Sequence, residues 1–114
     1  MRRNPSGGSA RQQGYASVFA ALGDQTRLNL VTRLTSGGPR SISALTEGSK
    51  LTRQAITKHL RVLEDAGIVH SVRTGRESLF QFDPQPIQGL REYLDLVSEQ
   101  WDQALARLKT FVER

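Results

Sequence analysis

The feature that most restricts how this chain can fold is a repeat of apolar side chains near its C-terminal end. From Ile87 to Val112, apolar residues recur at intervals of three and four positions for about seven helical turns. Pro84 and Pro86 stand where the first turn of a helix tolerates proline. The spacing therefore predicts one long helix over about residues 84–113. A chain of 114 residues forms a small core, so part of this stripe needs another surface to cover it.

Positive charge gathers in the part of the chain that precedes this helix. The sequence has 16 Lys and Arg residues against 11 Asp and Glu residues, for a net charge of +5. Residues 1–82 carry 12 of the basic and 5 of the acidic side chains, whereas residues 83–114 carry 4 and 6. A basic surface favours polyanionic partners, and charge alone does not choose between DNA, RNA and a membrane.

The composition excludes several classes of protein. With no cysteine, the chain has no disulfide, thiolate metal site or thiol redox sensor. No segment approaches the roughly 18 consecutive apolar residues of a membrane-spanning helix, and the N-terminal segment lacks the apolar core of a signal peptide. We expect a soluble cytoplasmic protein.

The N-terminal part divides into a polar tail and two helices. Residues 1–14 are rich in Gly, Ser, Gln, Asn and Arg, which predicts a flexible tail before a single domain over residues 15–114. The first helix of that domain ends at Gly23. Asp24 suits the N-cap of a second helix, which the Gly37–Gly38 pair ends.

The segment Leu51–Val69 places two chemically different faces on one helix. Thr52 suits the N-cap, because its hydroxyl accepts from the unpaired amides of a first turn, and the helix is expected over about residues 52–66. One face is apolar and consists of Ile56, Leu60 and Leu63. The opposite face is polar and consists of Arg53, Gln54, Thr57, Lys58 and Arg61.

A short helix precedes this two-faced helix, and a basic hairpin follows it. The short helix is capped by Ser41 or Ser43. Over about residues 68–82, apolar residues flank the sequence RTGRES, which predicts two strands joined by a turn that exposes Arg73 and Arg76. Together these elements predict a winged helix-turn-helix, a mainly α fold with a small β-hairpin and a long C-terminal helix.

This arrangement suits duplex DNA. A helix fits the major groove, where the base edges are distinguishable, and the arginines of the hairpin can lie along the backbone or the minor groove. Gln54 suits adenine, Arg53 and Lys58 suit guanine or phosphate, and Thr57 is small enough for close approach. The alternative is a solvated helix face. Each phosphate that the hairpin contacts should add about 0.9 to the slope with which the logarithm of the binding constant falls against the logarithm of the salt concentration.

The chain from about Tyr15 onward resembles the ArsR-type (arsenical-resistance repressor) family of dimeric transcription regulators. The resemblance rests on FAALGDQTRLNLVTRLTSGG and on SISALTEGSKLTRQAITKHLRVLEDAGIVHSVRTGRESLFQFDP, with DQTR and TKHLRVLEDAGIV as the most specific parts. It implies a homodimeric repressor with a recognition helix at Thr52–Ala66, a wing at Val69–Phe82 and dimer contacts from the first and last helices. Where turns of the family often hold Gly, Asp or Asn, this chain has Lys50.

Two sets of site residues follow from the pattern and the resemblance. The predicted DNA-binding residues are Thr52, Arg53, Gln54, Thr57, Lys58, Arg61, Arg73 and Arg76. The predicted dimer-interface residues are Val18, Phe19, Leu90, Leu94, Val97, Trp101, Leu105 and Leu108. For Trp101 the alternative is a ligand pocket. We interpret His59 as a packed or backbone-bonded residue, with a phosphate contact as the alternative, and Arg27 and Arg33 as ion-pairing residues or part of the DNA side.

No sensor chemistry is evident in the sequence. Metal-sensing members of the family use cysteines near the helix-turn-helix, or histidine and carboxylate pairs on the last helix, and neither set occurs here. We therefore expect no metal and no cofactor, and an effector, if there is one, that is a small organic molecule or a partner protein. No nucleophile with a positioned base is recognisable, so we do not expect an enzyme. A protein-interaction module or an architectural DNA binder on the same fold remains the alternative.

Overall fold

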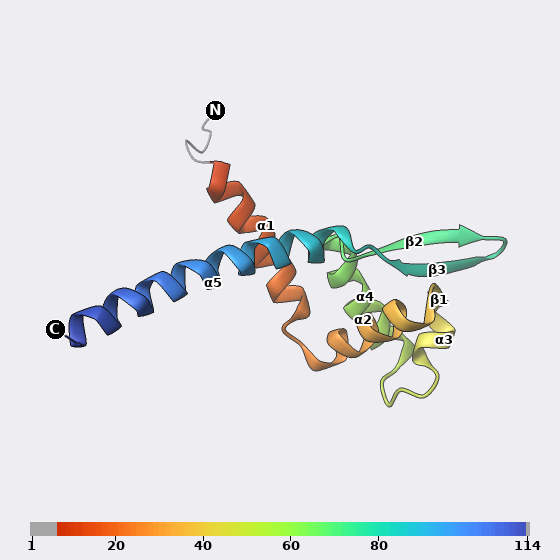
Figure 1. Ribbon diagram of the computed structural model, residues 1–114. Helices are drawn as coiled ribbons and strands as arrows, with labels where there is room; N and C mark the ends of the chain where they lie inside the picture. The colour runs from red at the N-terminus through yellow and green to blue at the C-terminus, as the bar shows by residue number, and fades with distance from the viewer. Residues whose placement is uncertain (1–6, 114) are drawn as a thin grey trace.

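The computed structural model describes the backbone of residues 7–113 and the side chains of residues 14–113. Within this range the chain forms helices and short strands whose order matches a winged helix-turn-helix (Figure 1). In chain order they are α1 (Gly7–Leu22), α2 (Gln25–Gly37), β1 (Arg40–Ser41), α3 (Ile42–Thr46), α4 (Arg53–Asp65), β2 (Val69–Thr74), β3 (Glu77–Phe82) and α5 (Gln85–Val112).

The core lies where α1, α2, α3 and α4 meet the base of the sheet. Its apolar side chains come from the faces that the three-and-four spacing predicts. The largest fully buried side chains are Leu45, Ile56, Leu60, Leu63, Ile68 and Val69. This core fixes the rotation of α4 about its axis, so its polar face points away from the domain.

Side-chain caps begin three of the helices, as predicted. The Asp24 carboxylate accepts from the Arg27 amide and the Thr52 hydroxyl from the Ala55 amide, each at 3.1 Å. Of the two serines considered for the short helix, Ser41 is the cap and accepts from the Ala44 amide. Each cap satisfies an amide that has no partner within the helix.

The predicted β-hairpin belongs to a three-stranded antiparallel sheet of order β1-β3-β2. Strands β2 and β3 form the hairpin, with Val69 opposite Phe82 and Thr74 opposite Glu77. The additional strand β1 pairs Arg40 with Phe80. Two residues are too few to show the alternation that identifies a strand in a sequence, so β1 was not predicted.

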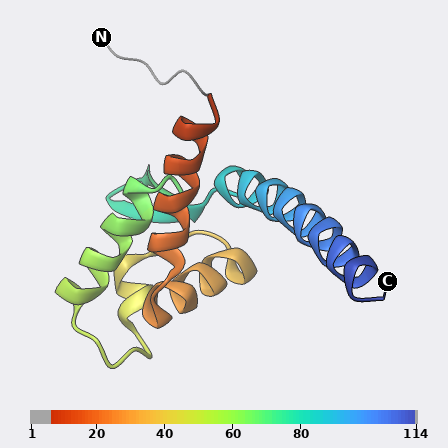
Figure 2. The same ribbon diagram turned by 90° about the vertical axis from the view of Figure 1, so that its left-hand side faces the viewer.

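Helix α5 leaves the domain instead of packing along it (Figures 1 and 2). Its 28 residues span about 42 Å at 1.5 Å per residue, and Leu90 is its buried residue. Near its start, the rings of Tyr93 and Tyr15 contact each other at a tilt of 33° with centroids 4.8 Å apart, which joins α5 to α1. The protruding helix and hairpin give the molecule extents of 67 × 41 × 21 Å.

Helix α1 begins earlier than the sequence analysis predicted. It starts at Gly7, so residues 7–14 are helical although they were expected in a flexible tail. Ala, Arg and Gln, which fill residues 10–13, have favourable helix propensities. The remainder of that predicted tail, residues 1–6, lies outside the described residues.

Candidate nucleic-acid interface

Helix α4 carries a polar outer face. Ile56, Leu60 and Leu63 are buried, whereas most of the polar side chains of the helix are in solvent. The exposed set is Arg53, Gln54, Lys58 and Arg61, and Thr57 is half-buried beside it. A rigid helix with this set of donors has the dimensions and chemistry to enter a major groove.

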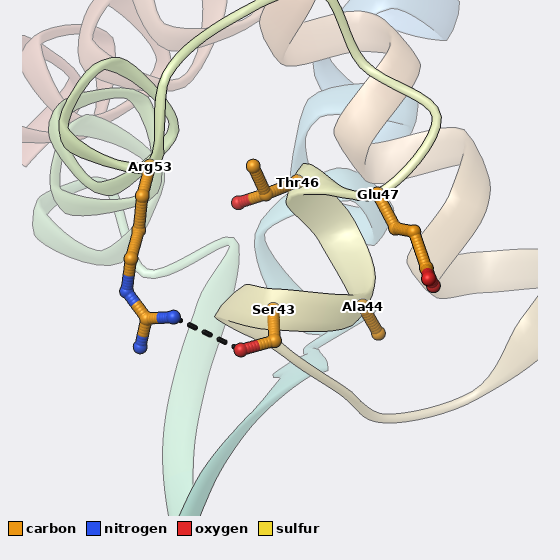
Figure 3. A pocket seen from close by; sticks show the side chains of 5 residues that line it. All are labelled: Ser43, Ala44, Thr46, Glu47 and Arg53. Carbon is orange, nitrogen blue, oxygen red and sulfur yellow. Dashed lines mark hydrogen bonds between the residues drawn. The ribbon is translucent and has the colours of Figure 1, made fainter.

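Arg53 differs from the other polar residues of α4 because it is already bonded to α3. Its guanidinium donates to the Ser43 hydroxyl oxygen at 2.9 Å (Figure 3). In the same view the Glu47 carboxylate points away from Arg53, to the other side of the short helix. The bond therefore holds the arginine between the two helices of the helix-turn-helix.

The two predicted threonine contacts have structural bonds of their own. The hydroxyl of Thr52 accepts from Ala55 as the helix cap, and that of Thr57 donates to the Arg53 carbonyl at 2.8 Å. Thr57 therefore presents a small side chain whose hydroxyl proton is already used in a hydrogen bond within the helix. Its contribution at a DNA surface would come from its size and its methyl group.

The wing presents its arginines at the end of the hairpin. Arg73 is exposed near the end of β2 and Arg76 is exposed in the turn, and Gly75 provides the positive φ of 62° that the turn requires. Arg73 Nε donates to the Gly75 carbonyl at 3.3 Å, which keeps its charge near the tip. The hairpin points away from the helical domain, as Figure 1 shows.

Arg27 and Arg33 bind backbone carbonyls, which corrects the expectation that they form ion pairs or line the DNA side. Arg27 donates to Ala21 O at 2.6 Å, at the C-terminal end of α1. Arg33 donates to the carbonyls of Leu45 and Ala44 at 2.8 and 2.9 Å, at the end of α3. Both arginines thus satisfy carbonyls that a helix end leaves without a partner.

His59 joins this polar network instead of packing in the core or bonding the backbone. Its Nδ1 lies 3.1 Å from Arg27 NH1. Since arginine has no acceptor, the histidine nitrogen accepts this bond. The Asp24 carboxylate lies 3.9 Å from the same nitrogen, so residues from the start of α2 and from α4 share one polar cluster.

Asp83 joins the base of the wing to the start of α5. One of its oxygens lies 2.8 Å from His70 Nε2, and the other accepts from the Gln85 amide at 2.9 Å. The amide bond, followed by the histidine bond, lowers the pKa of the Asp83 carboxyl. The sequence analysis predicted a helix start at about residue 84 but missed the role of His70, whose partner lies 13 residues away.

Most of the predicted dimer residues lie on the exposed stripe of α5. Phe19, Leu94, Trp101, Leu105 and Leu108 are exposed, Trp101 to 64%, and Val97 is half-buried. Val18 and Leu90, at 6% and 5% exposure, are instead buried in the core of the domain. Phe111 is also exposed, about 60° around the helix from Leu108, and was missed.

Two further structural features concern the residues that the structure describes. Across residues 7–113, His, Asp and Glu side chains nowhere gather in a group of three able to hold a metal ion. No described helix combines the length and apolar character needed to cross a bilayer.

Comparison with known proteins identifies the family. A helix-turn-helix domain family matches residues 22–72. The chain is 39% identical to the uncharacterized HTH-type transcriptional regulator YuzN of Bacillus subtilis, over 65% of this chain and 87% of the relative. It is 30% identical to the arsenical resistance operon repressor of the same organism, over 67% and 72% of the two chains.

The fold comparison agrees with the sequence matches. An ArsR-like transcriptional regulator from Rhodococcus sp. RHA1 superposes with a TM-score of 0.82 and 35% identity, covering 90% of this chain and 95% of that one. Members of this family are regulators and not enzymes. The chain therefore belongs to the ArsR family of winged helix-turn-helix, DNA-binding transcriptional regulators.

Proposed function

We propose that the chain acts as a homodimeric repressor that binds an inverted-repeat operator and needs no metal ion. The observation that carries this proposal is the pairing of two exposed surfaces on one rigid domain. One is the polar face of α4, and the other is the apolar stripe of α5. We place its action in the cytoplasm, with the chromosome.

The stripe supports a dimer because its apolar area is continuous and exposed. Trp101, Leu105, Leu108 and Val112 lie on one face of α5 beyond the domain. At 25 cal/mol per Å² of apolar surface, leaving such a face in water is unfavourable by several kcal/mol. A second copy offers a matching stripe, and a two-fold interface makes each surface its own partner.

A two-fold dimer sets the form of the DNA site. Each copy would present one α4 face, so the two half-sites would be inverted and about one helical turn apart, near 34 Å. The positive charge of residues 1–82 supports binding to the backbone. Repression is proposed from the similarity to the arsenical resistance operon repressor.

The proposed metal independence rests on the ligand chemistry of the chain. There is no cysteine in the sequence, and both histidines are engaged elsewhere, His59 with Arg27 and His70 with Asp83. Binding to DNA should therefore be the same in a chelator and in added zinc or nickel. A change of tenfold or more on metal addition would contradict this part of the proposal.

Selection of bound duplexes from a random pool tests the whole proposal. We expect an inverted repeat, and sedimentation should show one dimer on each selected duplex. Enrichment of no sequence at moderate salt, with strong binding at low salt, would identify an architectural binder. Absence of duplex binding under both conditions would favour a protein-interaction module.

A further inference from the structure

We infer that Arg53, Ser43 and Arg76 bind one phosphate of the DNA backbone, so that Arg53 positions the recognition helix and does not read a base. This inference rests on the proposed binding of DNA through α4. It changes the role given to Arg53, which the sequence placed among the base-reading residues. The position of Arg53 on α4, its bond to Ser43 and its place in a cleft with Arg76 support it.

Arg53 lies on the flank of α4, not at the centre of its outer face. At about 100° per residue, its Cα direction is only about 50° from the middle of the buried stripe. Gln54 and Lys58 lie about 150° or more from that direction. If the outer face points into the major groove, Gln54 and Lys58 point at base edges and Arg53 points towards a groove wall, where the phosphates are.

The bond to Ser43 turns the arginine further from the bases. The guanidinium reaches back to α3 and donates to Ser43 Oγ at 2.9 Å (Figure 3). A guanidinium has five N–H donors, and this bond uses one of them. Because the serine oxygen accepts, its own proton is free to be donated to the same ligand.

The third group comes from the wing. A single open cleft is lined by Ser43 and Arg53 on the helix-turn-helix and by Arg76 and Ser78 on the hairpin. Glu77 also lines this cleft, so its lining residues carry two positive charges and one negative charge, which leaves a positive balance. Planar guanidinium groups with hydroxyl donors beside them are well suited to a phosphate oxygen pair.

A phosphate in this cleft would connect α3, α4 and the wing at one point. That contact would fix the depth and register of α4 in the groove without carrying sequence information. Gln54 and Lys58 would then be the residues through which base preference is expressed.

The test combines Arg53→Ala with a scan of single methylphosphonate groups along the selected duplex. Wild-type protein should lose affinity by about tenfold when one particular phosphate in each half-site is neutralised. Arg53→Ala should bind every duplex about equally more weakly and should be indifferent to that substitution, as should Arg76→Ala. For Arg53→Ala, the slope of the logarithm of the binding constant against the logarithm of the salt concentration should become shallower by about 0.9 per half-site. Gln54→Ala, the matched control, should keep the phosphate sensitivity and change base preference.

Glu77→Gln provides an opposite effect from the same cleft. Removing the carboxylate should raise affinity on all sequences and leave the base preference unchanged. All variants are on exposed positions, and circular dichroism verifies their folding.

The inference is overturned if Arg53→Ala loses preference at one base pair, or remains as sensitive as wild type to every neutralised phosphate. Failure of the proposed function looks different, because wild-type protein would then select no sequence. In that case the salt dependence of binding to random duplex is compared between the wild type and Arg53→Ala. An equal dependence in the two proteins refutes the phosphate contact. Absence of any DNA binding by the wild type would refute both proposals.

Discussion

At the scale of single residues, several polar side chains serve the architecture of the domain and not its ligand. Arg27 is the clearest case, because it bonds the end of α1 through Ala20 and Ala21 and also His59 on α4. An arginine in a helix of a basic protein is easily interpreted as a DNA contact. Its geometry instead makes it a connection between three helices.

The pH dependence of stability should reveal the role of Asp24. The Arg27 amide bond, with the nearby Arg27 charge, lowers the pKa of the Asp24 carboxyl below its ordinary value of 3.8. The ionised carboxylate is therefore favoured in the folded state, and its stabilising effect is complete above about pH 3.8 and is lost as the pH falls through the lower folded pKa.

Asp24→Ala should accordingly unfold at a lower temperature than wild type at pH 7, and the difference should narrow below pH 3.8. Thermal unfolding of the wild type and of Asp24→Ala, followed by circular dichroism at several pH values, measures the difference in unfolding temperature and how it changes with pH. An equal difference at pH 2.5 and pH 7 would show that the carboxylate charge has no part in the cap.

At the scale of elements, helix starts and apolar faces could be predicted from sequence because their causes are local. The caps at Asp24 and Thr52 and the buried stripe of α4 each depend on residues within two turns of one another. The added strand β1 and the carbonyl bonds of Arg33 depend on partners far along the chain. No local sequence pattern predicts such contacts.

The same distinction applies to the candidate site. The spacing identified the polar residues of α4, but whether Arg53 faces a base or α3 is decided by Ser43, ten residues earlier. Likewise Val18 and Leu90 have apolar helical spacing that suits an interface, yet both are buried in the core of the domain.

Thr52→Ala tests the contribution of one cap to the recognition helix. Loss of the hydroxyl leaves the Ala55 amide unpaired, which should lower the free energy of unfolding by about 1 kcal/mol. Thr52→Ser keeps an accepting hydroxyl and should stay near wild type. Urea unfolding compares the three proteins, and equal stability of Thr52→Ala and wild type would mean that water replaces the cap without cost.

At the scale of the whole molecule, the wing, the recognition helix and α5 form one connected body. The His70–Asp83 bond joins the base of β2 to the start of α5, and the tyrosine pair joins α5 to α1. Assembly through α5 would therefore set the spacing of two α4 faces. Under the proposed function, dimerisation would therefore be a condition for binding an inverted repeat.

Trp101→Glu tests whether the stripe of α5 forms the dimer. A charge placed in an apolar interface is unpaired and desolvated, so the variant should sediment as a monomer and bind the selected operator weakly. Leu96→Glu is the matched control, because Leu96 is 53% exposed and lies roughly 120° around the helix from Leu90. Dimers that persist in Trp101→Glu would show that another surface holds the copies together.

The claim on which the account depends most is that the outer face of α4 reads base pairs. The most direct measurement compares wild type and Gln54→Ala on the selected operator and on each of its single base-pair variants, by fluorescence anisotropy at fixed salt. We predict that Gln54→Ala loses about 1 to 3 kcal/mol of discrimination at one or two positions in each half-site and keeps the remaining preferences. A uniform loss on all duplexes, or an unchanged profile, would contradict direct readout by this helix.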